Sequence, residues 1–250
     1  MEAVLHSFHG RNAVVTGANS GIGRATIDLL IGRGACVLAV DLDVSQLGGV
    51  PAITVSADLS EDSAPKRIAE AAGELGDLDL LVNCAGVGGS KRIAETDDAL
   101  LDRILGINLR SVIRLTRELL PLLRRPGGAI VNLASVYGEV GRVGTTAYAA
   151  SKGGISQLTR QLSAEVGPEG IRVNAVAPGC ILTAMTRTKI DNDPEYRRAM
   201  IAGTPLRRVG DSTEVAEVIA FLGSDQASFV NGQIVAVDGG WLASGGHFQE

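Results

Sequence analysis

A glycine-rich segment, residues 16–23, lies between a short apolar run and a stretch of helical period. Its glycines follow the spacing G-x₃-G-x-G. A strand that turns tightly into a helix presents backbone N–H groups to a diphosphate, provided that no Cβ atom blocks the approach. The alternative is a glycine-rich turn that binds nothing. It is disfavoured because the segment follows the first predicted strand. The cofactor-binding residues predicted in this segment are Gly17, Asn19, Ser20, Gly21, Ile22 and Gly23.

Short apolar runs alternate with helical segments along most of the chain. Runs that are apolar on both faces are typical of parallel strands covered by helices. The alternation predicts one α/β domain over residues 1–250: a Rossmann-type, doubly wound parallel sheet of about seven strands, flanked by helices on both faces. Predicted strands are 13–16, 36–41, 52–57, 78–84, 129–133, 171–177 and 234–237, and predicted helices are 21–33, 61–75, 96–123, 145–166 and 211–222.

Two connections are unusual in length. Only ten residues separate Asp41 from Ala52, which leaves room for one or two helical turns where a full crossover helix is usual. The polar segment 183–203, between a strand and the next helix, is predicted to be a mobile substrate flap beside the site.

Asp41 ends the second predicted strand, 18 residues after Gly23. A carboxylate there accepts hydrogen bonds from both hydroxyls of an adenosine ribose and repels a 2′-phosphate. No Arg or Lys stands at positions 19, 20 or 42 to neutralise such a phosphate. NAD is therefore the predicted cofactor, with NADP disfavoured. The alternative is that Asp41 only caps the turn together with Asp43.

Charge and hydropathy exclude several classes of partner. The net charge is −5, and the 23 basic residues form no run, which disfavours nucleic acid. No stretch approaches 18 uncharged apolar residues, so no membrane span is expected. The first ten residues contain no apolar run of the kind found in a secretory signal.

Three cysteines and three histidines show no metal-site or disulfide pattern. Cys36 and Cys84 lie in apolar runs, where a thiol is usually a small buried hydrophobe. An unpaired set of this kind is typical of a reducing compartment, so we expect a cytoplasmic protein. His6, His9 and His247 lie near the chain ends without ligand spacing, so no metal is expected and all three are predicted at the surface.

Further blocks match one family in order and spacing. They are Asp58-Leu59, Asn83-Cys84-Ala85-Gly86, Asn108, Ser135, Tyr148-Ala149-Ala150-Ser151-Lys152, Asn174-Ala175-Val176-Ala177-Pro178-Gly179 and Val237-Asp238-Gly239-Gly240. Together with the T-G-x₃-G-I-G turn and Y-x₃-K, they make the chain resemble the short-chain dehydrogenase/reductase family, in its form of about 250 residues, over essentially its whole length.

Tyr148 and Lys152 lie four residues apart on a predicted helix, so both point from one face. A phenol with a pKa of ~10 becomes a base near pH 7 only with roughly 4 kcal/mol of differential stabilisation, which an ammonium and an oxidised nicotinamide could supply. Alone, the pair could be a solvated helix face. Ser135, at the end of an apolar run, favours a site in which its hydroxyl binds the substrate oxygen.

The resemblance assigns roles to further residues. Asn108, a costly amide in an apolar helix, holds water in a proton relay through Lys152; a local backbone hydrogen bond is the alternative. Cys84 replaces an Asn that is usual in the family. The cofactor residues implied are Asp58, Leu59, Asn83, Ala85 and Gly86 at the adenosine, Ile181 and Thr183 at the nicotinamide carboxamide, and also Tyr148 and Lys152.

The implied activity is hydride transfer between NAD(H) and a small secondary alcohol or ketone, with Asn108, Ser135, Tyr148 and Lys152 as catalytic residues. An NADPH-dependent 3-oxoacyl-[acyl-carrier-protein] reductase is the main alternative, although Asp41 disfavours it. A non-catalytic dinucleotide sensor is disfavoured because all four side chains are present. The resemblance also implies a homotetramer or homodimer. Substrate identity would depend on residues 88–92, 136–145 and 183–203, to which no sequence rule applies.

Overall fold

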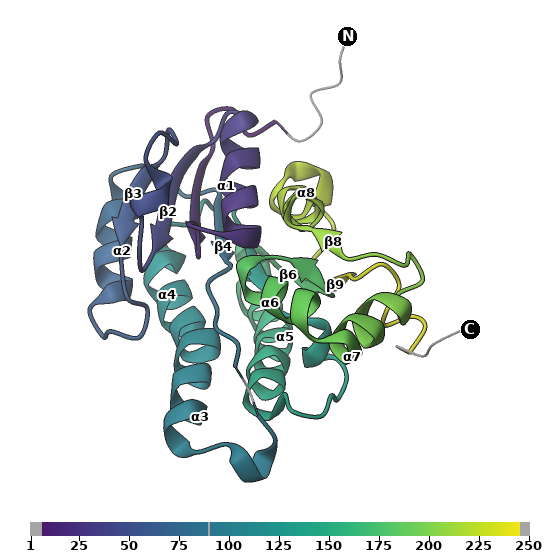
Figure 1. Ribbon diagram of the computed structural model, residues 1–250. Coiled ribbons are helices and arrows are strands. Elements are labelled where there is room, and N and C mark those ends of the chain that lie inside the picture. Colours follow the sequence, from purple (N-terminus) through teal and green to yellow (C-terminus); the bar gives the residue numbers. More distant parts are fainter. Residues whose placement is uncertain (1–6, 90, 246–250) are drawn as a thin grey trace.

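A seven-stranded sheet forms the centre of the molecule in the computed structural model, which describes residues 7–89 and 91–245 (Figure 1). The strand order is β3-β2-β1-β4-β5-β6-β9, and every neighbouring pair is parallel. The order reverses between β1 and β4, where doubly wound sheets bind their ligands. The strands are β1 (Asn12–Thr16), β2 (Cys36–Asp41), β3 (Ile53–Ser56), β4 (Leu80–Asn83), β5 (Ala129–Leu133), β6 (Arg172–Pro178) and β9 (Ile234–Val237).

Helices cover both faces of the sheet, as the sequence predicts. The α1 and α8 helices pack against each other on one face, and α2, α4 and α5 lie on the other. Alternate strand residues separate the two cores, since Val15 packs with the first pair and Val14 with α2 and α4. The helices are α1 (Gly21–Gly32), α2 (Ala64–Gly73), α3 (Asp98–Leu105), α4 (Ser111–Leu119), α5 (Thr146–Val166), α6 (Ala184–Asn192), α7 (Pro194–Arg197) and α8 (Ser212–Gly223).

The short connection after β2 contains one 3₁₀ turn, Ser45–Leu47, in agreement with the predicted helical turn. Because this turn is too short to cover the edge strand, β3 is mostly exposed rather than buried on both faces. Cys36 was also predicted to be buried, and this is wrong. It is the first residue of β2, beyond the reach of the covering helices, and it is exposed.

The predicted helix 96–123 is interrupted. A π-turn, Gly106–Arg110, joins α3 to α4, and a 3₁₀ turn, Leu120–Leu122, ends the segment. π-turns insert one extra residue and often occur at functional sites. Asn108 lies within this one.

Segment 183–203 is helical, with α6, α7 and a second π-turn, Arg198–Ala202. A two-stranded ribbon, β7 (Ile181–Leu182) with β8 (Gly210–Asp211), closes its base. No helix within the described residues has the length and apolar character needed to cross a membrane. His9 is exposed, as predicted, whereas His6 and His247 lie outside the described residues.

Candidate active site

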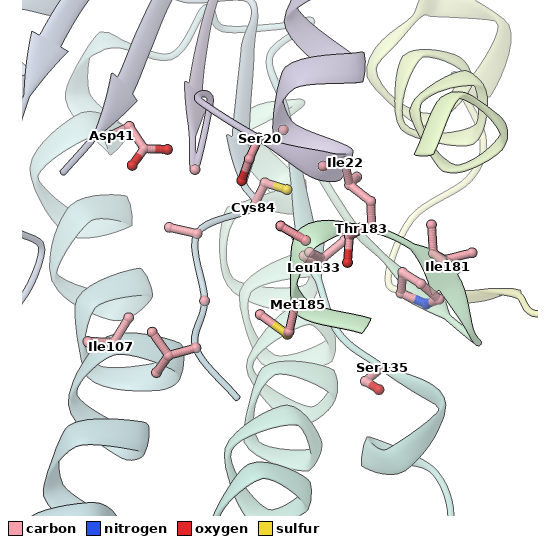
Figure 2. Close-up of a pocket in the computed structure, with 18 of the residues that line it drawn as sticks. Ser20, Ile22, Asp41, Cys84, Ile107, Leu133, Ser135, Ile181, Thr183 and Met185 are labelled. Carbon is pink, nitrogen blue, oxygen red and sulfur yellow. The ribbon is translucent and has the colours of Figure 1, made fainter. Parts of the chain in front are cut away.

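A cavity of about 390 Å³ opens at the carboxyl ends of the central strands, at the point where the strand order reverses (Figure 2). Its wall combines the β1–α1 turn, the ends of β2, β4 and β5, one face of α5, and the start of the 183–203 segment. The predicted site residues that line it are Gly17, Ser20, Gly21, Ile22, Gly23, Asp41, Asp58, Leu59, Ala85, Gly86, Ser135, Tyr148, Lys152, Ile181 and Thr183.

The glycine turn is packed backbone against backbone. A Cβ atom on Gly23 would lie 2.0 Å from the Gly17 carbonyl oxygen. One on Gly17 would lie 2.9 Å from the Ala85 Cα, and Gly17 has a φ of +70°, which L side chains rarely adopt. The turn therefore leaves its N–H groups and the start of α1 accessible, and this cradle fits the diphosphate of a dinucleotide.

Thr16 holds the two strands together where they separate. The β1–β4 pairing ends at Val15 opposite Val82. Beyond it, the Thr16 hydroxyl oxygen accepts hydrogen bonds from the backbone N–H groups of Cys84 and Ala85, both at 3.1 Å. One side chain thus replaces the backbone ladder at the mouth of the cavity.

Asp41 lies at the end of β2, on the cavity wall (Figure 2). Its Oδ2 accepts a hydrogen bond from the Asn19 backbone N–H at 2.9 Å, and its Oδ1 accepts one from the Leu42 N–H at 2.7 Å. Asn19 itself does not line the cavity and acts on the site through this bond. Lys152 is the only basic residue among the described residues of the wall, so Asp41 faces no cation at this end.

Lys152 is buried on α5, 3% exposed, and its Nζ donates a hydrogen bond to the Leu133 carbonyl at 2.6 Å. Burial lowers its pKa to about 8, because desolvation disfavours the charged form. Its Nζ lies 5.9 Å from the centroid of the Tyr148 ring. The cation therefore lies beside the phenol, as the Y-x₃-K spacing predicts.

Burial raises the pKa of Tyr148, and a hydrogen bond with Ser135 acts in the opposite direction. Ser135 is 6% exposed and caps the 3₁₀ turn Val136–Gly138, where its Oγ accepts a hydrogen bond from the Tyr137 N–H at 3.2 Å. The two hydroxyls lie on the same part of the cavity wall. Such an arrangement can bind one oxygen atom and exchange a proton with it.

Asn108 lies behind the cavity wall rather than in it. Its Oδ1 accepts a hydrogen bond from the Val87 N–H at 2.8 Å, and its Nδ2 donates to the Val87 carbonyl at 2.9 Å and to Ser151 Oγ at 3.2 Å. Its amide thus reaches a residue 21 positions away and not the local backbone. A Cβ atom on Gly86 would lie 3.3 Å from Asn108 Oδ1 and 3.6 Å from Lys152 Nζ.

Asn83 was predicted to bind the cofactor, but it is its neighbour Cys84 that lies on the cavity wall. The Asn83 amide is buried and donates to Asn132 Oδ1 at 2.9 Å and to Thr116 Oγ1 at 3.2 Å, so it fastens β4 to β5 and α4 and does not reach the cavity wall. Cys84 does line the cavity. Burial raises the pKa of its thiol to about 12, so it stays protonated.

Among the wall residues that sequence reasoning missed are Val87, Ile107 and Met185. The first two are neighbours of predicted residues, and their positions could have been inferred from Gly86 and Asn108. Met185 comes from α6, and a Cβ atom on Gly88 would lie 3.4 Å from its Sδ. No motif marks such a contact, because it depends on how the 183–203 segment folds back.

Comparisons with known proteins cover nearly the whole chain. The family model described as enoyl-(acyl carrier protein) reductase matches residues 17–242. The cis-4-hydroxycyclohexanecarboxylate dehydrogenase of Sinomonas cyclohexanicum is 42% identical, over 95% of this chain and 98% of that protein. The 3-oxoacyl-[acyl-carrier-protein] reductase FabG of Salmonella typhimurium is 35% identical, over 94% of this chain and 98% of its own length.

Solved structures agree with the fold. A candidate NAD(P)-dependent gluconate 5-dehydrogenase of Beutenbergia cavernae, solved with NADP at low occupancy, superposes with a TM-score of 0.87. It is 36% identical, and the match covers 95% of this chain and 99% of that one. Fold, cavity and relatives thus agree: the chain belongs to the short-chain dehydrogenase/reductase family and is an NAD(P)-dependent oxidoreductase of alcohols and ketones.

Proposed function

We propose that this protein transfers a hydride between NAD(H) and a secondary alcohol or ketone. The observation that carries the choice of NAD is the Asp41 carboxylate, held by two backbone N–H groups at the end of β2. Apart from Lys152, no basic side chain occurs among the described residues of the cavity wall. A ribose with free hydroxyls can donate to this carboxylate, whereas a 2′-phosphate would be repelled by it.

The bound dinucleotide supplies or accepts the hydride, and the chain's own residues handle the substrate oxygen and its proton. Ser135 donates a hydrogen bond to that oxygen, and the Tyr148 hydroxyl gives it a proton during ketone reduction or takes one during alcohol oxidation. The hydrogen bond between these two hydroxyls and their shared place on the wall support the assignment.

Lys152 stabilises the Tyr148 phenolate through its positive charge, 5.9 Å from the ring centroid. Asn108 completes a proton relay through Lys152. In support, Asn108 Oδ1 and Lys152 Nζ lie close together beside Gly86, since a Cβ atom added there would contact both of them. The two Asn108 hydrogen bonds to Val87 also fix the loop that forms this part of the wall.

Apart from Asn19 and Asn83, the predicted cofactor residues line the cavity. Asp58, Leu59 and Ala85 would surround the adenosine, and the β1–α1 turn would hold the diphosphate. Thr183 and the Ile181 backbone would bind the nicotinamide carboxamide. In support, all of these residues lie on the cavity wall, and Thr183 begins the segment that folds over it.

Cofactor choice is tested by titrating NADH and NADPH separately into wild-type protein, Asp41→Ala and Asp43→Ala, with calorimetry as the readout. We expect wild-type protein to prefer NADH and Asp41→Ala to lose roughly tenfold of that preference, because a charge-assisted hydrogen bond is removed. Asp43 caps Ser45 outside the cavity and should leave it unchanged. A wild-type preference for NADPH would overturn the choice of NAD.

Catalysis is tested with Tyr148→Phe, which removes only the hydroxyl. The turnover number should fall by a factor on the order of 10³, since proton transfer by a positioned side chain contributes roughly that much. NADH affinity should change little, because the ring remains. Turnover close to that of the wild type would remove Tyr148 from the mechanism.

The second candidate is a 3-oxoacyl-[acyl-carrier-protein] reductase that uses NADPH. It is favoured by the 35% identical relative of that name, and the description of the matching family model also names acyl carrier protein. A 3-oxoacyl thioester on acyl carrier protein, assayed beside simple cyclic ketones, separates the two candidates. Preference for the carrier-bound thioester with NADPH would place this candidate first.

We also propose a homotetramer, with a homodimer as the alternative. The proposal follows from the family to which the chain belongs, and Ile113 on α4, which is 45% exposed, offers one apolar side chain to such an interface. Light scattering after size exclusion gives the mass in solution directly. A monomer at micromolar concentration would contradict the proposal.

We further propose that the chain forms a single domain over residues 1–250. Within it, residues 183–203 act as a substrate flap. Met185 is 53% exposed on α6 and also lines the cavity, so it could cover a bound ligand. Limited proteolysis with and without NADH and substrate tests this, and we expect slower cleavage within 183–203 when both are bound. Equal cleavage would contradict the flap.

A cytoplasmic location is the last part of the proposal. The free thiols at Cys36, Cys84 and Cys180 are typical of a reducing compartment. Fractionation of the source cells tests it.

A further inference from the structure

An aromatic cluster lies beyond the candidate active site, between the loop after β5 and the 183–203 segment. Tyr137 and Trp241 meet edge to face, with their ring centroids 6.1 Å apart. The Tyr137 hydroxyl lies 3.0 Å from the Sδ of Met200, which is buried. Tyr196, on α7, packs against the same apolar cluster.

Arg142 lies inside this cluster. Its guanidinium carbon is 5.6 Å from the centroid of the Tyr137 ring and 5.8 Å from that of Tyr196. Contacts with two aromatic faces hold a guanidinium in place without using its N–H donors. The guanidinium is thus fixed, with its hydrogen-bonding edge available.

Arg142 has no carboxylate partner in the part of the chain that the structure describes. None of the ion pairs formed there includes it. Its side-chain hydrogen bond there goes to the Met200 sulfur at 3.6 Å, and a thioether is a weak acceptor. A half-buried guanidinium with five N–H donors ordinarily binds oxygen.

The groups around Arg142 do not balance its charge. Burial raises the pKa of Tyr137 to about 12 and also raises the pKa values of Tyr196 and Cys180, so all three are neutral near pH 7. Glu139, the only acid in residues 136–145, is bound to Ser156 and pairs with Arg160 instead.

Tyr137 connects Arg142 to the reacting groups. Its backbone N–H donates to Ser135 Oγ, and its ring contacts the Arg142 guanidinium. On its other side, Arg142 lines a second cavity of about 190 Å³ together with Trp241 and Leu242. A ligand that reaches from Tyr148 past Tyr137 therefore meets the cation.

We propose that Arg142 binds the carboxylate of the substrate, while the carbinol or carbonyl group of the same molecule lies at Ser135 and Tyr148. The substrate class is then a hydroxy acid or oxo acid whose two functional groups are several bonds apart. Its skeleton is apolar, since Val136 and Trp241 form the surroundings. The inference rests on the proposed function for the position of the reacting group.

The alternative is that Arg142 only clamps the 183–203 segment to the loop through its two tyrosines. A clamp would affect charged and neutral ligands equally, because it acts through the shape of the site. A carboxylate-binding residue would affect only the charged ligand. Matched pairs of ligands therefore separate the two.

The test is calorimetric binding to the NADH-saturated protein. The ligands are 4-oxocyclohexanecarboxylate and its carboxamide, with 5-oxohexanoate and its amide as a linear pair. We expect wild-type protein to prefer the carboxylate of at least one pair by a factor on the order of 10 to 100, the size of a charge-assisted hydrogen bond. Arg142→Gln should abolish the preference and leave binding of the amide within about threefold.

Two further variants act as controls. Arg142→Lys keeps the positive charge but loses the paired N–H donors of the guanidinium, so part of the preference should remain. This variant replaces Arg142→Gln in the test if Arg142→Gln does not fold. Lys66→Gln removes a positive charge from an exposed side chain on α2, so this variant should behave like the wild type.

The outcomes are separable from those of the proposed function. Absence of a carboxylate preference in the wild type, its persistence in Arg142→Gln, or an equal loss of both ligands would each overturn the inference. Turnover of neutral ketones without such a preference would leave the proposed function intact. A preference that depends on Arg142, without hydride transfer, would support the inference and contradict the proposed function.

Discussion

The two ends of the site, the dinucleotide cavity and the aromatic cluster beyond it, are built from different kinds of contact. At the dinucleotide end, backbone meets backbone: Gly23 lies against the Gly17 carbonyl, and Gly17 lies against Ala85. In the aromatic cluster beyond the residues that line the cavity, long side chains such as Tyr137 and Arg142 converge instead. The first arrangement excludes any side chain at certain positions, whereas the second allows many combinations. This difference suggests that cofactor recognition is rigid and substrate recognition is adaptable.

Of the changes that compare the two ends, Gly23→Ala has the largest expected effect, and it tests the rigidity of the dinucleotide end. The added methyl would lie 2.0 Å from the Gly17 carbonyl oxygen, so the turn must shift. We expect a loss of NADH affinity of at least 100-fold, or about 3 kcal/mol, together with a lower melting temperature. Calorimetry and thermal denaturation measure the two.

Gly32 offers a matched control on the same helix. An added Cβ there meets nothing within 4 Å, so Gly32→Ala should stabilise the protein by roughly 0.5–1 kcal/mol and leave NADH binding unchanged. If both variants bound NADH like the wild type, the rigidity of this end would be refuted.

Lys152 lies where the two ends meet, and its burial should make stability depend on pH. Its pKa is about 8 in the fold and 10.5 when exposed, so between these values the unfolded chain binds more protons and stability rises with pH. From pH 7.5 to 9.5 the expected rise is about 2 kcal/mol. Urea denaturation of wild-type protein and Lys152→Met should show this rise in the wild type only. Equal slopes would mean that Lys152 is not desolvated.

Tyr137→Phe tests the adaptability of the substrate end. It removes a hydroxyl whose contact is the weak acceptor Met200 Sδ at 3.0 Å. We expect stability to change by less than about 1 kcal/mol and the KM for substrate to rise a few-fold. NADH affinity, measured in parallel, should not change. A change in NADH affinity as large as that in KM would show that the two ends are not independent.

The smallest effect is expected from thiol alkylation. Cys36 is exposed at the end of β2 that lies opposite Asp41, whereas Cys84 and Cys180 are buried. Iodoacetamide should label Cys36 in the native protein, followed by mass spectrometry, with no loss of NADH affinity. Rapid labelling of Cys84, whose pKa burial raises to about 12, would show that the cavity opens more than the structure indicates.

The same contrast explains what could be predicted from the sequence. The parallel sheet and the dinucleotide turn depend on local patterns, such as the period of apolar residues and the spacing of glycines. Accordingly, the predicted strands recur in the fold, and Gly17, Gly21 and Gly23 all line the cavity. The proximity of Tyr148 and Lys152 also followed from helical spacing, whereas their placement in a site depended on Ser135 and the family resemblance.

The unpredicted features depend on long-range packing. The π-turn around Asn108 interrupts a segment whose pattern reads as one continuous helix, because a bond to Val87, 21 residues away, holds it. The exposure of Cys36 reflects where the covering helices end rather than the apolar run around it. Met185 enters the wall only because residues 183–203 fold back over it.

Thr16 gives the crevice a further property. A sheet that parts must leave amide groups without their usual neighbours, and here one hydroxyl satisfies two of them, those of Cys84 and Ala85. Valine has the same shape but no oxygen, and it would strand both amides in the interior. The Thr16 hydroxyl oxygen thus lets the two strands separate while it keeps them joined. Replacements at this position should be tolerated according to their hydrogen-bonding capacity rather than their size.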